Sequence, residues 1–200
     1  MVHRLPRHPE PPVNWAERPL PLVSHKSSLW RIHSKRRDAL FFGKTGDFRF
    51  DDPAHEFGVL YTSVSWFGAF VETAGHRTGR GLITDAWRVQ RVLCEIIPSR
   101  VLRLVDLRGR GLARLGVDAR LVTGEHALAQ RWSRALWLHP SKPDGICYPC
   151  RHDPSQSAVA LYDRARRALK VCPVGTLSDR KMDARLSDAL DRYGFGLIAD

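Results

Sequence analysis

The segment from Phe57 to Gly75, FGVLYTSVSWFGAFVETAG, constrains the fold of this chain more than any other part. The apolar run Gly58 to Tyr61 predicts a buried strand. Thr62, Ser63 and Ser65 are residue types that cap helices, and they predict a helix directly after that strand. Among the apolar residues of that helix stands one carboxylate, Glu72. Because burial of a carboxylate is costly unless another group pairs with it, we interpret Glu72 as either half of a structural ion pair or an active-site acid. Tyr61 would face it from the end of the strand, across one pocket.

Two arginines interrupt other apolar segments. Arg31 stands inside LWRIH, which predicts a strand over residues 29–33, and Arg49 stands between Phe48 and Phe50. A strand over residues 48–50 would place both phenylalanines on one face and Arg49 on the other. Since guanidinium groups bind phosphates with two hydrogen bonds, the pair suits a diphosphate in a cleft. The alternative, two surface arginines flanked by core residues, stays open.

Length and composition indicate a folded domain. The chain has 200 residues, an apolar fraction of 43%, six Trp and a net charge of +11, which together predict one domain with a sizeable core. No stretch approaches the roughly 18 apolar residues of a membrane span. The basic residues are spread along the chain without a nucleic-acid motif, so we expect an anionic small molecule or an acidic partner. Direct nucleic-acid binding is the alternative.

The first residues read as a separate leader. Residues 1–24 are rich in proline and lack the apolar run of a signal peptide. We therefore expect an extended or disordered leader over 1–24, one domain over 25–200, and a cytoplasmic protein with reduced thiols.

Strand and helix patterns alternate along the chain without a regular βαβ rhythm. Strands are predicted at 29–33, 48–50, 59–61, 91–97, 101–107, 145–148 and 158–162, and helices at 65–74, 112–115, 124–138 and 182–193. Glycines at 79–81 and 109–111 predict turns. The fold class expected is therefore α+β, a single domain with a mixed β-sheet core and flanking helices.

One cysteine pair has the spacing of a metal or redox motif. Cys147 and Cys150 form a single CxxC, with Cys172, His139 and His152 as conceivable further ligands. Zinc sites usually use a second pair, and redox CxxC motifs usually open a helix. We therefore predict free thiols and no metal.

Five segments, taken in their order and spacing, resemble the RES domain family, which is named for its Arg, Glu and Ser motif residues. They are LWRIH, GDFRFDDP, FGVLYTSVSWFGAFVETAG, LRLVDLRG and HPSKPDGICYPCRHDPSQSAVALYD. The likeness covers the chain from roughly Leu22 to Leu197.

The resemblance implies a fold similar to that of ADP-ribosyltransferase toxins and an NAD-degrading activity. Family members are mostly toxins of bacterial toxin–antitoxin pairs that cleave the nicotinamide–ribose bond with water or inorganic phosphate. The partner is typically an Xre-like helix-turn-helix antitoxin, so nucleic acid would be contacted only indirectly, through that partner. NAD is then a substrate, phosphate is a candidate co-substrate, and no resident cofactor is expected.

The family's motif residues map onto this chain as follows. The motif arginine corresponds to Arg31, the glutamate to Glu72, the second arginine to Arg49 and the strand-end tyrosine to Tyr61. The serine, which usually ends a Gly-Ile-x-Tyr-x-Ser pattern, is replaced here by Cys150. By this resemblance Glu72, Arg31 and Tyr61 are catalytic, and Arg31, Arg49, Tyr61 and Cys150 bind NAD.

The function expected from this mapping is that of an NAD glycohydrolase or NAD phosphorylase neutralised by an antitoxin. Because a thiol is a weaker hydrogen-bonding group than a hydroxyl, Cys150 leaves two alternatives open. The chain is then a catalytically weak relative that binds a partner, or a transferase that passes ADP-ribose to a protein. The sequence also leaves open whether the chain forms a homo-oligomer.

Overall fold

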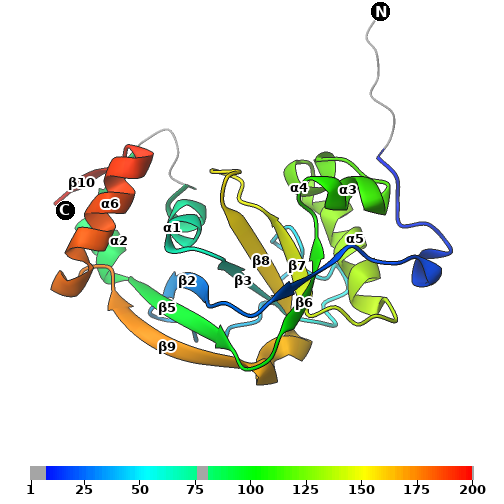
Figure 1. The fold of residues 1–200 in the computed structure, drawn as a ribbon. Coiled ribbons are helices and arrows are strands. Elements are labelled where there is room, and N and C mark those ends of the chain that lie inside the picture. Colours follow the sequence, from blue (N-terminus) through cyan, green and yellow to red (C-terminus); the bar gives the residue numbers. More distant parts are fainter. Residues whose placement is uncertain (1–7, 76–80, 200) are drawn as a thin grey trace, which may run out of the picture.

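An eight-stranded, mostly antiparallel sheet runs through the computed structural model, which describes residues 8–75 and 81–199 (Figure 1). In spatial order its strands are β1 (Leu22–His25), β6 (Leu102–Asp106), β7 (Gly145–Pro149), β8 (Ser157–Tyr162), β3 (Val59–Ser63), β2 (Leu29–Ser34), β5 (Arg91–Pro98) and β9 (Leu169–Thr176). Strands β6 and β7 run parallel, so the sheet is mixed. A separate parallel pair joins β4 (Leu82–Thr84) to β10 (Gly196–Ile198).

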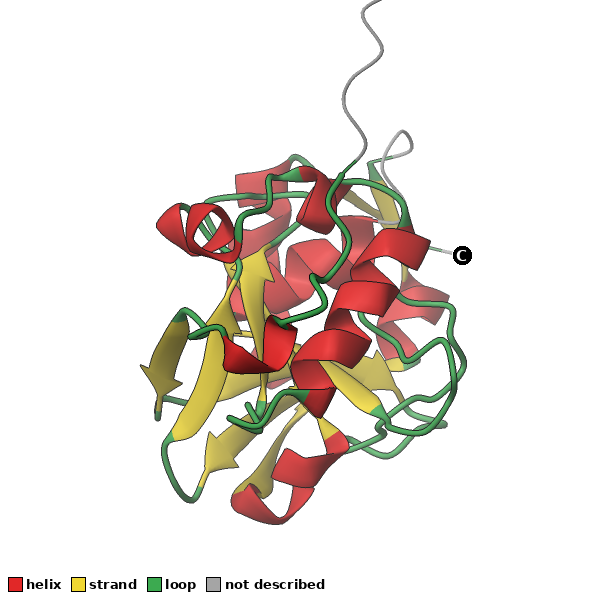
Figure 2. Ribbon diagram, turned by 90° about the vertical axis from the view of Figure 1, so that its right-hand side faces the viewer, coloured by secondary structure: helices red, strands yellow, loops and turns green. Residues whose placement is uncertain are grey.

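Helices flank this sheet. They are α1 (Trp66–Ala74), α2 (Asp85–Val89), α3 (Arg110–Leu115), α4 (Arg120–Thr123), α5 (His126–Leu138) and α6 (Asp183–Tyr193), with 3-10 turns η1 (Trp15–Glu17), η3 (Asp163–Ala168) and η4 (Arg180–Met182). The view at right angles shows the helices gathered mainly on one side and the strands on the other (Figure 2). The predicted α+β class, with a mixed sheet and flanking helices, is confirmed.

Alternation along the strands divides the core into layers. On β3, Val59 and Tyr61 pack with the cluster beneath α5, whereas Leu60 packs on the opposite face. On β7, Ile146 contributes to the first cluster and Cys147 to the second. Both strands are thus buried on both faces, which explains why they read as continuous apolar runs.

The sheet separates between β2 and β3. These two neighbours share a single registered pair, Trp30 with Ser63, whereas β2 pairs with β5 over six residues, from Leu29 to Ser34. Beyond Trp30 the two strands diverge, and the backbone groups of β3 that face β2 need other partners. The opening between these strands becomes one side of the site described below.

Most predicted elements are confirmed, but the strand expected at 48–50 is wrong. These residues lie in a loop whose backbone N–H groups are satisfied by side chains: that of Phe48 donates to Asp51 at 3.2 Å and that of Phe50 donates to the Tyr61 hydroxyl at 2.9 Å. The two phenylalanines do not share a face either, since Phe50 is fully buried and Phe48 is exposed.

The proline-rich N-terminal segment packs on the domain. The Trp15 ring meets that of Trp132 edge to face at 4.9 Å, and Leu20 is buried in the same cluster. The expected boundary at residue 24 falls inside β1, which pairs with β6 from Leu22 to His25. Residues 8–24 thus belong to the domain in this structure, and residues 1–7 of the predicted leader lie outside the described part.

Of the two predicted glycine turns, the one at 109–111 leads into α3, and Gly109 takes a positive φ of 44° there. Most of the turn predicted at 79–81 lies outside the described residues. Among the helices of the described ranges, none has the length and apolarity needed to cross a membrane.

Candidate functional site

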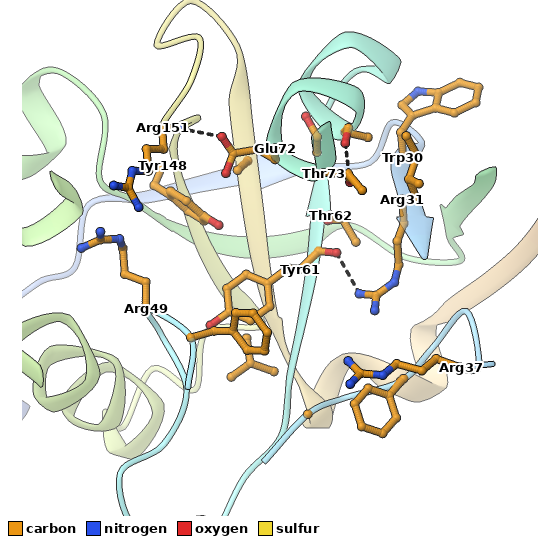
Figure 3. Close-up of a pocket in the computed structure, with 18 of the residues that line it drawn as sticks. Trp30, Arg31, Arg37, Arg49, Tyr61, Thr62, Glu72, Thr73, Tyr148 and Arg151 are labelled. Carbon is orange, nitrogen blue, oxygen red and sulfur yellow. Dashed lines mark hydrogen bonds between the residues drawn. The ribbon is translucent and has the colours of Figure 1, made fainter. Parts of the chain in front are cut away.

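A cleft with a cavity volume of about 280 Å³ opens where β2 and β3 separate. Helix α1 forms one side, β7 and the following loop another, and the 41–49 loop a third (Figure 3). Of the predicted site residues, Arg31, Arg49, Tyr61 and Glu72 line it together. These side chains come from β2, the 41–49 loop, β3 and α1, so four separate segments meet at one place.

Glu72 reaches the cleft from α1. The helix begins after Ser65, whose hydroxyl oxygen accepts a hydrogen bond from the Gly68 N–H at 2.9 Å. The Glu72 Oε1 atom accepts from the backbone N–H of Arg151 at 2.7 Å and of His152 at 3.3 Å. No ion pair joins Glu72 to a cation elsewhere in the described ranges. Of the two interpretations open from the sequence, the described residues therefore show no structural ion pair at Glu72.

Arg31 crosses the gap between β2 and β3. Its Nη1 donates to the Tyr61 carbonyl at 2.9 Å, satisfying a backbone group that the separated strands leave open. Its Nε is buried and has no hydrogen-bond partner among the described residues. Burial lowers the pKa of Arg31 to about 10, and the nearby positive charge of Arg37 acts in the same direction. Arg31 is therefore not a surface arginine, and an anion in the cleft would relieve its cost of burial.

Arg49 enters from the loop on the opposite side. Its Nη1 donates to the Gly124 carbonyl at 2.7 Å, which fixes the side chain beside Tyr148. Partial burial lowers the pKa of Arg49, and the positive charge of Arg151 lowers it further. Positive charges thus gather at both ends of the cleft, with Arg31 near Arg37 and Arg49 near Arg151.

Tyr61 lies between these ends, but its hydroxyl is already engaged. The hydroxyl donates to Asp51 Oδ1 at 2.9 Å and accepts from the Phe50 N–H at 2.9 Å. Burial raises the pKa of Tyr61 well above its ordinary value, and the Asp51 charge adds to this. Its ring packs near that of Phe48, with centroids 5.6 Å apart, so the ring is the part of Tyr61 that serves the cleft.

Cys150 does not line the cleft with the other predicted residues. It is buried behind the site, where its Sγ would lie 3.4 Å from a Cβ added at Gly68. The same added Cβ would fall 2.1 Å from Ser63 Oγ, so only glycine fits there. Burial raises the pKa of the Cys150 thiol to about 12, and the Glu72 charge contributes. Cys150 thus supports α1 from below as an uncharged thiol.

Comparison with known proteins agrees with this architecture. A family model described as "RES domain" matches residues 28–185. The chain belongs to the RES domain family. A protein of Sinorhizobium fredii named "Probable toxin y4kH" is 40% identical over 112 residues, covering 55% of this chain and 86% of that protein. A chain of the M. tuberculosis MbcT-MbcA toxin-antitoxin complex superposes with a TM-score of 0.62 at 16% identity, over 82% of this chain and 92% of that one. The α+β fold is thus shared with a solved toxin–antitoxin structure.

The cleft of this RES domain is also lined by residues that were not predicted from the sequence, among them Tyr148, Arg151 and Arg37. Tyr148 could have been found, because strand alternation places it on the same face as Cys150, two residues on. Nothing in the pattern assigned Arg37 or Arg151 to a site, since Arg37 lies in a short basic stretch and Arg151 in the loop after Cys150, both outside strands and helices.

The conceivable ligands around the CxxC motif do not converge. Cys147 and Cys150 lie in different core clusters of the RES domain, and Cys172 is exposed on β9. His139 is engaged with the Arg18 carbonyl at 3.1 Å. Across residues 8–75 and 81–199, no group of three or more His, Cys, Asp or Glu side chains could hold a metal ion.

Proposed function

We propose that this protein cleaves the nicotinamide–ribose bond of NAD. One observation carries the proposal: the Glu72 carboxylate, held by backbone N–H groups rather than by a cation, shares a cleft with the guanidinium groups of Arg31 and Arg49. This arrangement offers a negative charge for a developing cation and positive charges for a diphosphate. NAD has both matching parts: a ribose that becomes positively charged as nicotinamide leaves, and a diphosphate.

Glu72 would stabilise the transition state. Breaking the bond to nicotinamide leaves positive charge on the ribose, and a fixed carboxylate lowers the energy of that oxocarbenium-like state. Because the two backbone N–H groups bind only Oε1, the other oxygen is available to the ribose or to the attacking nucleophile. Glu72 could then orient or deprotonate that nucleophile.

The arginines would bind the diphosphate. In each guanidinium one nitrogen has a hydrogen-bond partner within the protein: Arg31 Nη1 donates to the Tyr61 carbonyl and Arg49 Nη1 to the Gly124 carbonyl. Each guanidinium retains N–H groups that can donate hydrogen bonds to phosphate oxygens. Binding of the diphosphate in this way would fix the ribose against Glu72. The ring of Tyr61 would offer a surface to the neutral nicotinamide as it leaves.

NAD is consumed in this reaction, so the proposal includes no resident cofactor. Water and inorganic phosphate are both candidates for the attacking group. The guanidinium groups around the cleft carry enough positive charge to bind a phosphate beside the diphosphate. Assays with and without phosphate decide between hydrolysis and phosphorolysis.

We further propose that this NAD cleavage makes the protein a bacterial toxin acting in the cytoplasm. The similar protein of Sinorhizobium fredii is named a probable toxin, and the structural neighbour comes from a toxin-antitoxin complex. Depletion of NAD would arrest growth, and a cognate antitoxin, of the helix-turn-helix type, would prevent this by covering the cleft.

The direct test is release of free nicotinamide from NAD by the purified chain. Wild type should release nicotinamide, whereas Glu72→Gln, which keeps the shape and the acceptor oxygen, should lose roughly 100- to 1000-fold in rate. Glu17→Gln, an exposed carboxylate outside the cleft, is the matched control. A wild-type protein that releases no nicotinamide, with or without phosphate, would contradict the proposal and favour a partner-binding role.

A further inference from the structure

One of the four tyrosines differs from the rest in what its hydroxyl does. The Tyr61 hydroxyl donates to Asp51 at 2.9 Å, that of Tyr162 to the Ser133 carbonyl at 3.0 Å, and that of Tyr193 to Asp153 at 2.9 Å. Tyr148 is 8% exposed, yet within the described part of the chain its hydroxyl has no hydrogen-bond partner. The ring is buried, but the hydroxyl oxygen is not sealed in the core and opens into the cleft, where it can donate and accept hydrogen bonds.

The position of Tyr148 indicates what this hydroxyl binds. Its ring is fixed by an edge-to-face contact with Phe50, with centroids 4.8 Å apart. The side chain comes from β7 into the cleft between Glu72 and Arg49 (Figure 3). The hydroxyl is thus presented rigidly beside the carboxylate proposed to face the ribose.

The protonation state of Tyr148 suits a donor. Burial raises its pKa well above the ordinary value, and the Glu72 charge raises it further. The phenol therefore keeps its proton throughout the neutral range. A neutral phenol can donate one hydrogen bond and accept another, which matches the needs of a sugar hydroxyl.

Tyr61 cannot take this role, although it lies in the same cleft. Its hydroxyl already donates to Asp51 and accepts from the Phe50 N–H. The same Asp51 also accepts from the Phe48 N–H on the other side of Arg49. Asp51 therefore positions both Tyr61 and the loop that carries Arg49, and the Tyr61 hydroxyl serves the structure rather than a ligand.

We propose that Tyr148 is a substrate-contacting residue whose hydroxyl binds a hydroxyl of the nicotinamide-bearing ribose beside Glu72. This inference rests on the proposed NAD cleavage and adds a residue to it. It divides the work of the two tyrosines: Tyr61 contributes a ring anchored by Asp51, and Tyr148 contributes the free hydroxyl.

The test uses Tyr148→Phe, which removes the hydroxyl and keeps the ring that packs on Phe50. We expect the thermal midpoint of unfolding to stay within a few degrees of wild type, because no intramolecular hydrogen bond is lost. We expect kcat/KM for NAD cleavage to fall roughly 10- to 100-fold, as for a lost hydrogen bond to a buried polar group. Calorimetry should show weaker binding of ADP-ribose, the product that keeps the ribose and the diphosphate.

Tyr193→Phe is the matched control, since it removes one hydroxyl outside the cleft, and should keep the parental rate. Tyr148→Phe with unchanged turnover and unchanged ADP-ribose affinity would overturn the inference and leave NAD cleavage standing. Lower turnover with unchanged ADP-ribose affinity would overturn the ribose contact. A wild-type protein that cleaves no NAD would instead overturn the proposed function, and this assignment with it.

Discussion

The 45–57 loop and the adjoining cleft differ in how far their polar side chains are hydrogen-bonded. In the 45–57 loop, the carboxylates of Asp51 and Asp52 are fully buried and each accepts several hydrogen bonds. In the adjoining cleft, Arg31 has a buried Nε without a partner among the described residues. The Tyr148 hydroxyl opens into the same cleft and makes no hydrogen bond to another described residue. A buried group left unpaired costs about 1–3 kcal/mol. The loop is therefore organised for stability, and the cleft is organised for a ligand.

The difference explains how the loop keeps Arg49 in place. Asp52 accepts from the N–H groups of Glu56 and Phe57 and forms an ion pair with Arg134 at 3.0 Å. Asp51 ties the same loop to Tyr61. Carboxylates with all their hydrogen bonds made thus fix the loop that carries Arg49 and the side chain of Tyr61 beside the cleft. This is the arrangement expected of a preorganised site.

The largest effect on stability should come from Asp52→Ala. This change leaves Arg134 with one partner fewer and several backbone N–H groups without an acceptor, so the free energy of unfolding should fall by about 3–5 kcal/mol. Urea denaturation measures this. Glu56→Ala, which removes the exposed partner of the same arginine, should cost less than about 1 kcal/mol. Equal losses of stability in the two variants would contradict the claim that the buried carboxylate Asp52, and not the exposed Glu56, stabilises the loop.

Acid denaturation tests the contribution of Asp52 to stability in a second way. Burial raises the pKa of Asp52, but the N–H groups of Ala54 and Glu56 together with Arg134 outweigh it, so the folded-state pKa lies below the ordinary 3.8. The resulting stability is fully present above pH 3.8 and is lost as the pH falls through the folded-state value. Asp52→Ala should therefore flatten the decline of stability below about pH 4.

In the cleft, Arg31→Met should separate binding from stability. Methionine has a similar volume, and replacing a buried charge by an apolar side chain is often neutral or stabilising. We expect the free energy of unfolding to fall by no more than about 1–3 kcal/mol, the cost of leaving the Tyr61 carbonyl without its donor, and the affinity for NAD to fall at least about 10-fold. Calorimetry checks the affinity, and Arg114→Met, an exposed arginine outside the cleft, is the control. A destabilised variant with normal affinity would make Arg31 a structural residue.

A smaller effect is expected from Arg37→Ala. Arg37 is exposed, stacks over Phe41 at 5.1 Å and lines the Arg31 end of the cleft. Its loss should weaken NAD binding roughly threefold at low salt and less at high salt, because exposed charges are screened. The neighbouring Arg36→Ala, which lies outside the cleft, should change nothing. Equal effects of the two changes would indicate a general charge effect rather than a site residue.

The parts of the fold visible in the sequence were those decided locally. Strand β3 and helix α1 follow from an apolar run and the Ser65 cap. The 48–50 loop was misread as a strand because its conformation depends on Asp51 and on the Tyr61 hydroxyl, which the local pattern does not contain. The short edge strand β1 was missed because proline-rich sequence surrounds it, and β9 because Pro173 and Gly175 interrupt it.

The site was predictable only in part for a similar reason. Arg31, Arg49, Tyr61 and Glu72 were singled out by the residue pattern and given roles by the resemblance to the family, and the structure brings these four to one cleft. Cys150 was placed with them because it takes the family serine's position, but it lies behind the cleft. Alternation with Cys150 offered a signal for Tyr148, but which face of a strand lines a cavity depends on pairing with distant strands, so Tyr148 was overlooked.

The central claim is that Glu72 acts on a substrate instead of holding the fold together. The most direct measurement compares nicotinamide release from NAD by wild type and by Glu72→Gln, together with their thermal unfolding. The account predicts active wild type, a roughly 100- to 1000-fold slower variant, and closely similar unfolding midpoints. A Glu72→Gln variant that cleaves NAD as fast as wild type would contradict it.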